Sequence, residues 1–142
     1  MTFEPFEPFK PWHLLALDPL GLPESVGTFV SVGYGEALAA RGPAYTAWAD
    51  EHILLCGGIA RDDSGQGWLW SFVAPVASRH FLTLHRYVVR FLSVYPMPLK
   101  ATTEKRLAVS CRWLELLGFE RTQDEWPAFI PGGSDHYVYR RG

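Results

Sequence analysis

One glycine, which follows a long amphipathic segment, constrains this chain more than any other feature of its sequence. Residues 106–117 have the apolar spacing of a helix, and Gly118 follows at once. A glycine just past a helix can adopt the left-handed backbone that closes the last carbonyls. Phe119 then falls where a Schellman-type ending places an apolar contact on Leu114. We therefore predict a helix that ends at Leu117, with Leu114 in the core.

The middle of the chain predicts β-structure. Residues 44–51 alternate between apolar and polar, and residues 52–63 contain a buried apolar run. The turn Ser-Gly-Gln-Gly then separates this run from the apolar residues that end at Ala74. Strands joined by a glycine-rich turn form a hairpin, so residues 44–74 are expected to form a three-stranded antiparallel meander.

The order of elements predicts an α/β (α+β) fold. Residues 77–95 have apolar side chains at helical spacing and are expected to form one helix. Residues 106–117 form the second. The other expected elements are a short helix at 12–17, a helical piece within 34–42, and strands at 99–103, near 126–130 and at 136–140. The 99–103 strand follows a helix and should run parallel to the strand at 68–74. The result is a central mixed sheet, an antiparallel meander followed by helix, strand, helix and two strands.

Composition excludes several classes of protein. The chain has 142 residues, 48% hydrophobic and 20% charged, with a net charge of −2. A chain with this balance is globular, and it has no basic surplus for nucleic acid or an anionic membrane. It contains no apolar run as long as a membrane span and no signal-peptide pattern, and its two cysteines lack metal spacing. A cytoplasmic protein is expected, not a secreted one.

The first residues form a separate arm. Residues 3–11 read Phe-Glu-Pro-Phe-Glu-Pro-Phe-Lys-Pro, and proline at every third position excludes both a helix and a central strand. An extended polyproline-like arm over 1–11 would align Phe3, Phe6 and Phe9 on one edge. We expect these rings to dock on the chain's own domain, 12–142, or to mediate self-association or binding to a protein partner.

The segment Ala-Val-Ser-Cys-Arg-Trp-Leu-Glu-Leu-Leu-Gly-Phe-Glu, residues 108–120, resembles the helix-to-strand junction of the GNAT superfamily of acetyl-CoA-dependent N-acetyltransferases. In so short a chain it is closest in style to the GNAT-like proteins of tailed bacteriophages, including the internal virion protein A type. The resemblance implies a GNAT-like sheet over residues 44–140. It also implies an acetyl-CoA site in the segment after the fourth strand, with a virion-associated role as the phage-type alternative.

The residues that GNAT enzymes use are altered here. The family's phosphate-binding loop contains glycines that bring backbone amides to the pyrophosphate, whereas residues 73–82 contain none. If acetyl-CoA binds at all, the resemblance places it on five residues: Val73, Ala74, Ser78, Arg79 and His80. The position of the family's proton-donating tyrosine is Leu114, and Ser71 stands on the strand where many members have a basic glutamate. The side chains that could substitute for the tyrosine and the glutamate lie near the C-terminus: Asp135, His136, Tyr137 and Tyr139.

Other reactive side chains favour structural roles. His80 and His85 are five residues apart and do not share a helix face as metal ligands four apart do. Cys56 and Cys111 sit in apolar runs typical of core residues, although a Cys/His pair stays open. Arg79, Arg86 and Arg90 form either a solvated face or a contact for phosphate or carboxylate.

The sequence therefore favours a non-catalytic GNAT-fold protein of phage type. Such a pseudoenzyme would bind a protein partner, need no cofactor and no metal, and work in the cytoplasm of an infected bacterial host or in the virion. The alternative is an N-acetyltransferase that uses acetyl-CoA on a host protein or a small amine.

Overall fold

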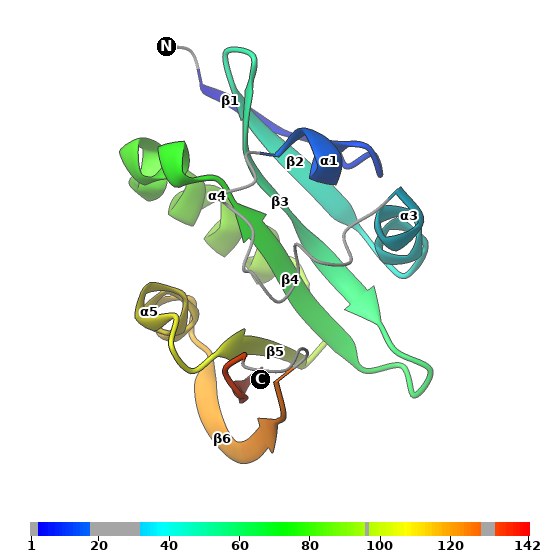
Figure 1. Cartoon of the computed structure of the whole chain (residues 1–142), viewed down its shortest axis with the longest axis vertical. Coiled ribbons are helices and arrows are strands. Elements are labelled where there is room, and N and C mark those ends of the chain that lie inside the picture. Colours follow the sequence, from blue (N-terminus) through cyan, green and yellow to red (C-terminus); the bar gives the residue numbers. More distant parts are fainter. Residues whose placement is uncertain (1–2, 18–31, 96, 129–132) are drawn as a thin grey trace.

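The computed structural model describes residues 3–17, 32–95, 97–128 and 133–142 (Figure 1). Within these parts seven strands form one sheet, in the order β1-β2-β3-β4-β5-β7-β6. The elements in chain order are β1 (Phe3–Pro8), α1 (His13–Ala16), α3 (Val32–Ala40), β2 (Ala44–Ala49), β3 (His52–Arg61), β4 (Gly67–Val73), the 3₁₀-helix η2 (Pro75–His80), α4 (Phe81–Ser93), β5 (Leu99–Glu104), α5 (Ala108–Leu116), β6 (Glu120–Trp126) and β7 (His136–Arg141).

The predicted fold class is confirmed. Neighbouring strands are antiparallel except β4 and β5, which are parallel as expected for residues 68–74 and 99–103. The meander expected over 44–74 is formed by β2, β3 and β4. Among the described residues, no helix is long and apolar enough to cross a membrane.

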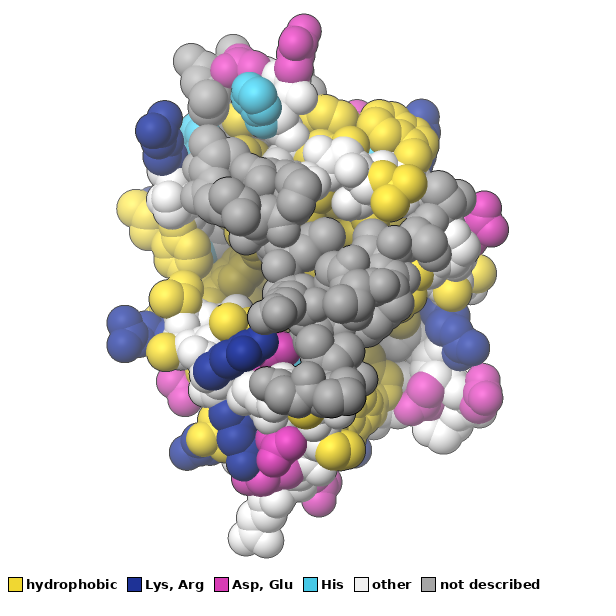
Figure 2. All heavy atoms as spheres, viewed as in Figure 1, with side chains coloured by type: hydrophobic (Ala, Val, Ile, Leu, Met, Phe, Trp, Pro, Cys, Tyr) yellow, Lys and Arg dark blue, Asp and Glu magenta, His cyan; other side chains and the backbone are white. Residues whose placement is uncertain are grey.

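Helices cover both faces of the sheet (Figure 1). On β4, Trp70 packs in a cluster with Leu14 of α1, whereas Leu69 packs against Val88 of α4 and Leu117 at the end of α5. Since neighbouring side chains of a strand point to opposite faces, α1 lies on one face of the sheet and α4 and α5 lie on the other. On the side viewed in Figure 2, acidic and basic side chains are interspersed, as the small net charge suggests.

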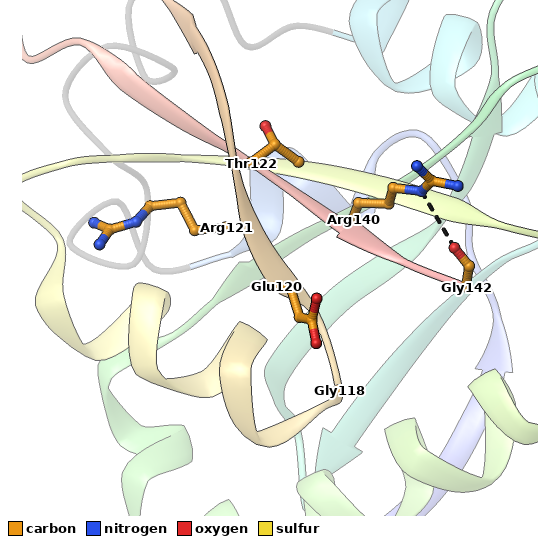
Figure 3. Close-up of a pocket in the computed structure, with 6 residues that line it drawn as sticks. All are labelled: Gly118, Glu120, Arg121, Thr122, Arg140 and Gly142. Atoms are coloured by element: carbon orange, nitrogen blue, oxygen red, sulfur yellow. Dashed lines mark hydrogen bonds between the residues drawn. The ribbon is translucent and has the colours of Figure 1, made fainter.

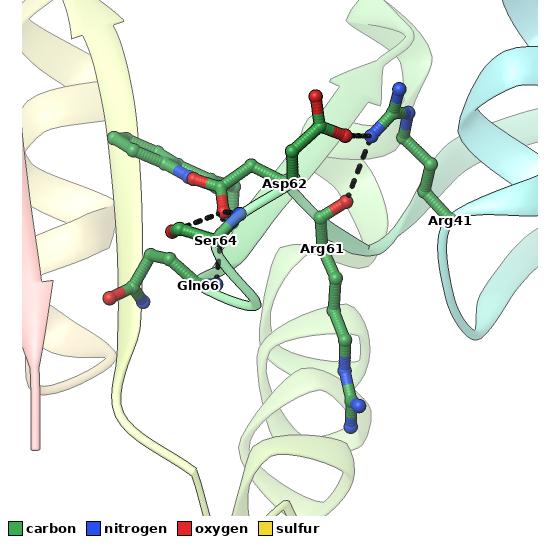
Figure 4. Close-up of polar contacts among 7 residues, drawn as sticks. Arg41, Arg61, Asp62, Ser64 and Gln66 are labelled. Atoms are coloured by element: carbon green, nitrogen blue, oxygen red, sulfur yellow. Dashed lines mark hydrogen bonds and ion pairs between the residues drawn. The ribbon is translucent and has the colours of Figure 1, made fainter.

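The turn between β3 and β4 is closed by Asp62 (Figure 4). Its Oδ1 accepts hydrogen bonds from the hydroxyl of Ser64 at 2.7 Å and from the backbone N–H groups of Ser64 and Gln66 at 2.9 and 3.0 Å. Its Oδ2 accepts from the indole of Trp68 at 2.9 Å. The bonds from Ser64 and Trp68 lower the pKa of Asp62 to about 2. The hairpin tip therefore fixes the start of β4.

Two element boundaries differ from the sequence prediction. The helix expected over 77–95 begins as the 3₁₀-helix η2, and α4 starts only at Phe81; 3₁₀ turns are frequent at the ends of α-helices. The strand expected near 126–130 is instead β6, and residues 129 and 130 lie outside the described residues. Nearly every side chain of β6 is exposed, so this edge strand has no apolar alternation to reveal it.

The N-terminal arm is the edge strand β1. It pairs antiparallel with β2, with a register shift between Glu4 and Glu7. Phe9, just after β1, is buried in the cluster below α1 and contacts Trp70 edge-on at 5.3 Å between ring centroids. Phe9 is thus part of the chain's own core and is not exposed for a partner. A partner role for the rest of the arm stays a prediction.

His13 fastens this arm to the sheet. Its side chain is buried, the backbone N–H of Lys10 donates to its Nδ1 at 3.1 Å, and the hydroxyl of Thr46 lies 2.7 Å from the same nitrogen. Because Nδ1 accepts the amide hydrogen, the ring is neutral and carries its proton on Nε2, which faces Glu7 at 3.9 Å. Burial lowers the pKa of His13, and the charge of Glu7 opposes this only in part.

The ending of α5 is the predicted Schellman motif. Gly118 has φ of 94°, its N–H donates to the carbonyl of Glu115 at 3.0 Å, and the N–H of Phe119 donates to the carbonyl of Leu114 at 3.0 Å. Phe119 is buried, while Leu114 is only half-buried and packs at the margin of the same cluster. The expectation that Leu114 lies fully in the core is therefore corrected.

We expect Gly118→Ala to lower the free energy of unfolding by about 1–2 kcal/mol, because an L-residue resists the left-handed backbone. A Cβ at this position has room, since its nearest neighbour is Arg141 Nε at 3.6 Å. Gly118→Asn, which tolerates this conformation better, should cost less. Urea denaturation measures both changes, and equal losses for the two variants would contradict this assignment.

We expect the protein to lose stability as the pH falls below 6.5, the ordinary pKa of histidine. The folded state keeps His13 neutral while the unfolded chain takes up a proton. Its contribution is therefore fully present above this pH and lost as the pH falls toward the lowered pKa of the folded state. Denaturation at a series of pH values measures the effect. His13→Gln should weaken the pH dependence, and an unchanged dependence would show that another group causes it.

Candidate functional site

The sheet opens between its two parallel strands. β4 and β5 pair only through Gly67 opposite Leu99 and Trp68 opposite Lys100. Beyond Trp68, β4 keeps its partner β3 to the end, and β5 keeps its partner β7, so the two strands diverge toward their carboxyl ends (Figure 1). Within the described parts of the chain, the facing edges of residues 69–73 and 101–104 therefore have no strand partner. Ligands of open α/β sheets bind outside the carboxyl ends of strands that part in this way.

The other end of this opening is held shut. Gly67 leaves room for the Leu99 side chain, because a Cβ at Gly67 would lie only 2.9 Å from Leu99 Cδ2. The side chain of Gln66 donates to the carbonyl of Pro98 at 3.1 Å and ties the β3–β4 turn to the start of β5. One end of the β4–β5 boundary is thus fixed and the other is free.

The residues predicted to hold acetyl-CoA lie at the free end. Val73 ends β4, and Ala74 is buried, with its N–H donating to the carbonyl of Leu54 at 2.9 Å. Ser78 and Arg79 are exposed on η2, and His80 immediately precedes α4. Because the N–H of Ala74 is already bonded, any backbone contact to an anion has to come from η2 and the first turn of α4.

A buried carboxylate that the sequence did not reveal stands at the same end. Glu104 ends β5, is 2% exposed, and its Oε2 accepts from Arg106 Nε at 2.7 Å. His136 of β7 lies directly opposite, and burial lowers its pKa more than the charge of Glu104 raises it. The register places both side chains on the face that carries α1. The one signal in the sequence was an acidic residue just after the expected 99–103 strand.

The helices that flank the opening touch through aromatic side chains. Trp113 of α5 donates its indole N–H to His85 Nδ1 of α4 at 3.1 Å, and its ring meets Phe81 edge-on at 5.7 Å. Leu114, at the position of the family's proton donor, is the next residue along the helix. No described side chain replaces that tyrosine on α5, whose length is Ala108–Leu116.

The remaining candidates from the sequence do not converge on one site. Tyr139 is buried beneath α5, and burial together with a hydrogen bond to Cys111 raises its pKa to about 12. Tyr137 lies between the cations of Lys105 and Arg121, at 5.2 and 4.4 Å from its ring centroid. The other predicted side chains are placed as follows: Ser71, Arg79, Arg86, Arg90 and Asp135 are exposed, His85 is half-buried, and Cys56 is buried, with burial raising its pKa to about 12. Among the described residues, no cluster could hold a metal ion.

A second hollow at the β6–β7 edge, of about 500 Å³, is lined by Gly118, Glu120, Arg121, Thr122, Arg140 and Gly142 (Figure 3). Its two arginines do not converge. Arg140 Nε donates to the carbonyl of Gly142 at 3.2 Å, and Arg121 turns away from it toward Tyr137. This hollow lacks the convergent groups of a binding site.

No protein-family model matches the sequence, and no curated protein matches it. Solved structures do match. An acetyltransferase of the GNAT family from Streptococcus pneumoniae has a TM-score of 0.64 at 13% identity, over 98% of each chain. This is the GNAT fold. The ribosomal-protein-S18-alanine N-acetyltransferase from Escherichia coli matches at a TM-score of 0.71 and 14% identity, over 99% of this chain and 93% of the other.

A third match corrects the prediction that no cofactor is needed. RimL, a ribosomal L7/L12 alpha-N-protein acetyltransferase solved in complex with coenzyme A, has a TM-score of 0.73 at 10% identity, over 99% of this chain and 94% of its own. A chain with the GNAT fold is thus known to hold coenzyme A. The prediction rested on the absence of glycine from residues 73–82. In the family such glycines contact only the pyrophosphate, which is one part of the cofactor.

We expect Arg106→Met to lower the free energy of unfolding by about 2 kcal/mol, because it removes a charged hydrogen bond from the buried carboxylate of Glu104. The double variant with Glu104→Gln should recover part of this loss, since the remaining group is neutral. Chemical denaturation of the four proteins gives the coupling energy. Additive losses in the double variant would show that the two side chains do not interact.

Proposed function

We propose that this protein is an N-acetyltransferase that binds acetyl-CoA where β4 and β5 part. The divergence of the two strands after Trp68 carries this proposal, because it leaves two facing backbone edges without partners at the carboxyl end of a parallel pair. The matches to acetyltransferases of the same fold support it. Acetyl-CoA supplies the activated acyl group, and the chain supplies binding, orientation and a proton acceptor.

The residues present fit such a cofactor. Within residues 69–73 and 101–104, the N–H and C=O groups that point toward the opening can bond the amides of an extended pantetheine arm as a neighbouring strand would. The first turn of α4 has no acidic residue, so its electrostatic environment does not oppose a phosphate there. Arg79, exposed just before this turn, adds a positive charge.

Glu104 is the side chain best placed to accept the proton of an acceptor amine. Its carboxylate lies at the free end of β5, buried and oriented by Arg106. Leu114 cannot donate a proton, which points to slow turnover, because a positioned acid or base contributes about 10²–10⁴-fold in rate. An α-amino group, whose ordinary pKa is about 7.7–8.0, needs less help to lose its proton than a lysine at about 10.4. We therefore propose a protein N-terminus as the acceptor, the class named for RimL and the S18 enzyme.

A non-catalytic, partner-binding protein of phage type is the second candidate. The glycine-free segment after β4 and Leu114 at the position of the proton donor favour it. In that case the site would bind acetyl-CoA without turnover or bind nothing, and the partner would dock elsewhere, for example on the outer edge of β1. The matched structures described above are acetyltransferases, and this favours the enzyme.

We expect acetyl-CoA at about 100 times its dissociation constant to stabilise the fold by about 2.7 kcal/mol, seen as a rise of several degrees in melting temperature. Arg79→Ala should weaken this response. Arg86→Ala removes the same charge from the exposed surface of α4 and serves as the matched control. No rise in the wild-type protein would contradict the proposal. Release of free thiol from acetyl-CoA with an N-terminal peptide, lost in Glu104→Gln, would distinguish the enzyme from the binding protein.

A further inference from the structure

The outer side of α4 carries apolar side chains that face solvent. Leu82 and Val89 are 70% and 43% exposed, and the two arginines that follow at helical spacing, Arg86 and Arg90, are exposed as well. Positions 82, 86, 89 and 90 fall on one face of a helix, whereas the buried residues of α4 lie on the opposite side and face the sheet. We call this outward face, formed by Leu82, Arg86, Val89 and Arg90, the α4 stripe.

The α4 stripe is positively charged, and no acidic residue near it in the sequence balances it. Residues 64–103 contain four basic residues and no aspartate or glutamate, in a chain with 13 basic and 15 acidic residues. Among the described residues, no carboxylate lies within salt-bridge distance of Arg86 or Arg90, whereas Lys105 and Arg106 each pair with one. The two arginines of the stripe are therefore left to pair with acidic groups of another molecule.

We propose that the α4 stripe binds an acidic amphipathic helix of another protein. Leu82 and Val89 are seven residues apart, which is the repeat with which one helix presents an apolar seam to another. Arg86 and Arg90 lie beside this seam, where they can pair with glutamates or aspartates that flank the seam of the partner. Charge complementarity thus selects the partner, and burial of the two apolar side chains stabilises the complex.

A protein helix fits this stripe better than an anionic membrane or a nucleic acid. On a phosphate backbone the affinity comes from cations, so Leu82 and Val89 would have no partner there. An anionic lipid surface attracts clusters of about four to eight lysines and arginines, whereas here two arginines alternate with apolar residues. Because the stripe points away from the sheet, this inference does not depend on acyl transfer at the β4–β5 opening.

The test uses a synthetic helical peptide of about 18 residues with a leucine seam flanked by glutamates. Fluorescence anisotropy gives its dissociation constant for the wild type and for two double variants, Arg86→Glu with Arg90→Glu and Leu82→Ser with Val89→Ser. We expect saturable binding to the wild type and a loss of about tenfold or more in each double variant. Arg140→Glu is the matched control, since it reverses an exposed charge on the face of the sheet that carries α1, and it should bind the peptide as the wild type does.

A second peptide tests the charges directly. In this peptide lysines replace the glutamates, so it should not bind the wild type. It should bind the double variant Arg86→Glu with Arg90→Glu, because the charges of both partners are then exchanged. A variant that had lost binding through misfolding could not gain the second peptide.

The outcomes decide this inference separately from the proposed function. It is overturned if the glutamate peptide shows no saturable binding up to about 1 mM, or if all four proteins bind it equally. Tighter binding to phosphatidylserine vesicles or to a DNA duplex than to the peptide, lost when Arg86 and Arg90 are reversed, would also overturn it. The partner would then be a membrane or a nucleic acid. Absence of an acetyl-CoA-induced rise in the melting temperature of the wild type contradicts the proposed function alone.

Discussion

The site depends on one short contact between parallel strands. β4 and β5 pair through two residue pairs at their amino ends. The hydrogen bond from Gln66 to Pro98 ties these ends together, and Gly67 leaves room there for the Leu99 side chain. Each strand has a full-length antiparallel partner on its other side. The sheet therefore stays intact while its middle opens, and backbone groups that would normally pair have no strand partner among the described residues. A longer β4–β5 ladder would close this opening.

The opening divides the molecule into two chemical environments. On one face, α4 and α5 close over it through the contact of Trp113 with His85. On the other face lie Trp70, Glu104 and the core below α1. A cofactor that enters along the strands would meet the helix ends first and present its acyl group to the second face. Leu114, at the position of the family's tyrosine, belongs to α5 and therefore to the first face.

Much of the fold could be predicted because local physics fixes it. The Gly118 ending, the meander and the crossover that makes β5 parallel to β4 follow from backbone conformation, alternation and the handedness of connections. The edge strand β6 could not be predicted, since both its faces are exposed and its pairing with β7 is a long-range contact. The same limit hid Glu104, whose surroundings come from β7.

The most direct test of this account is a map of backbone amide shifts by NMR as acetyl-CoA is added. We predict that the largest shifts lie within residues 69–73 of β4, 101–104 of β5 and the first turn of α4, because alternate amides of the two strands face the opening and the helix begins at its free end. Residues 55–61 of β3, already paired along all of β4, should move far less. Shifts concentrated instead at β1 or at the β6–β7 hollow, with β4 and β5 unaffected, would contradict it.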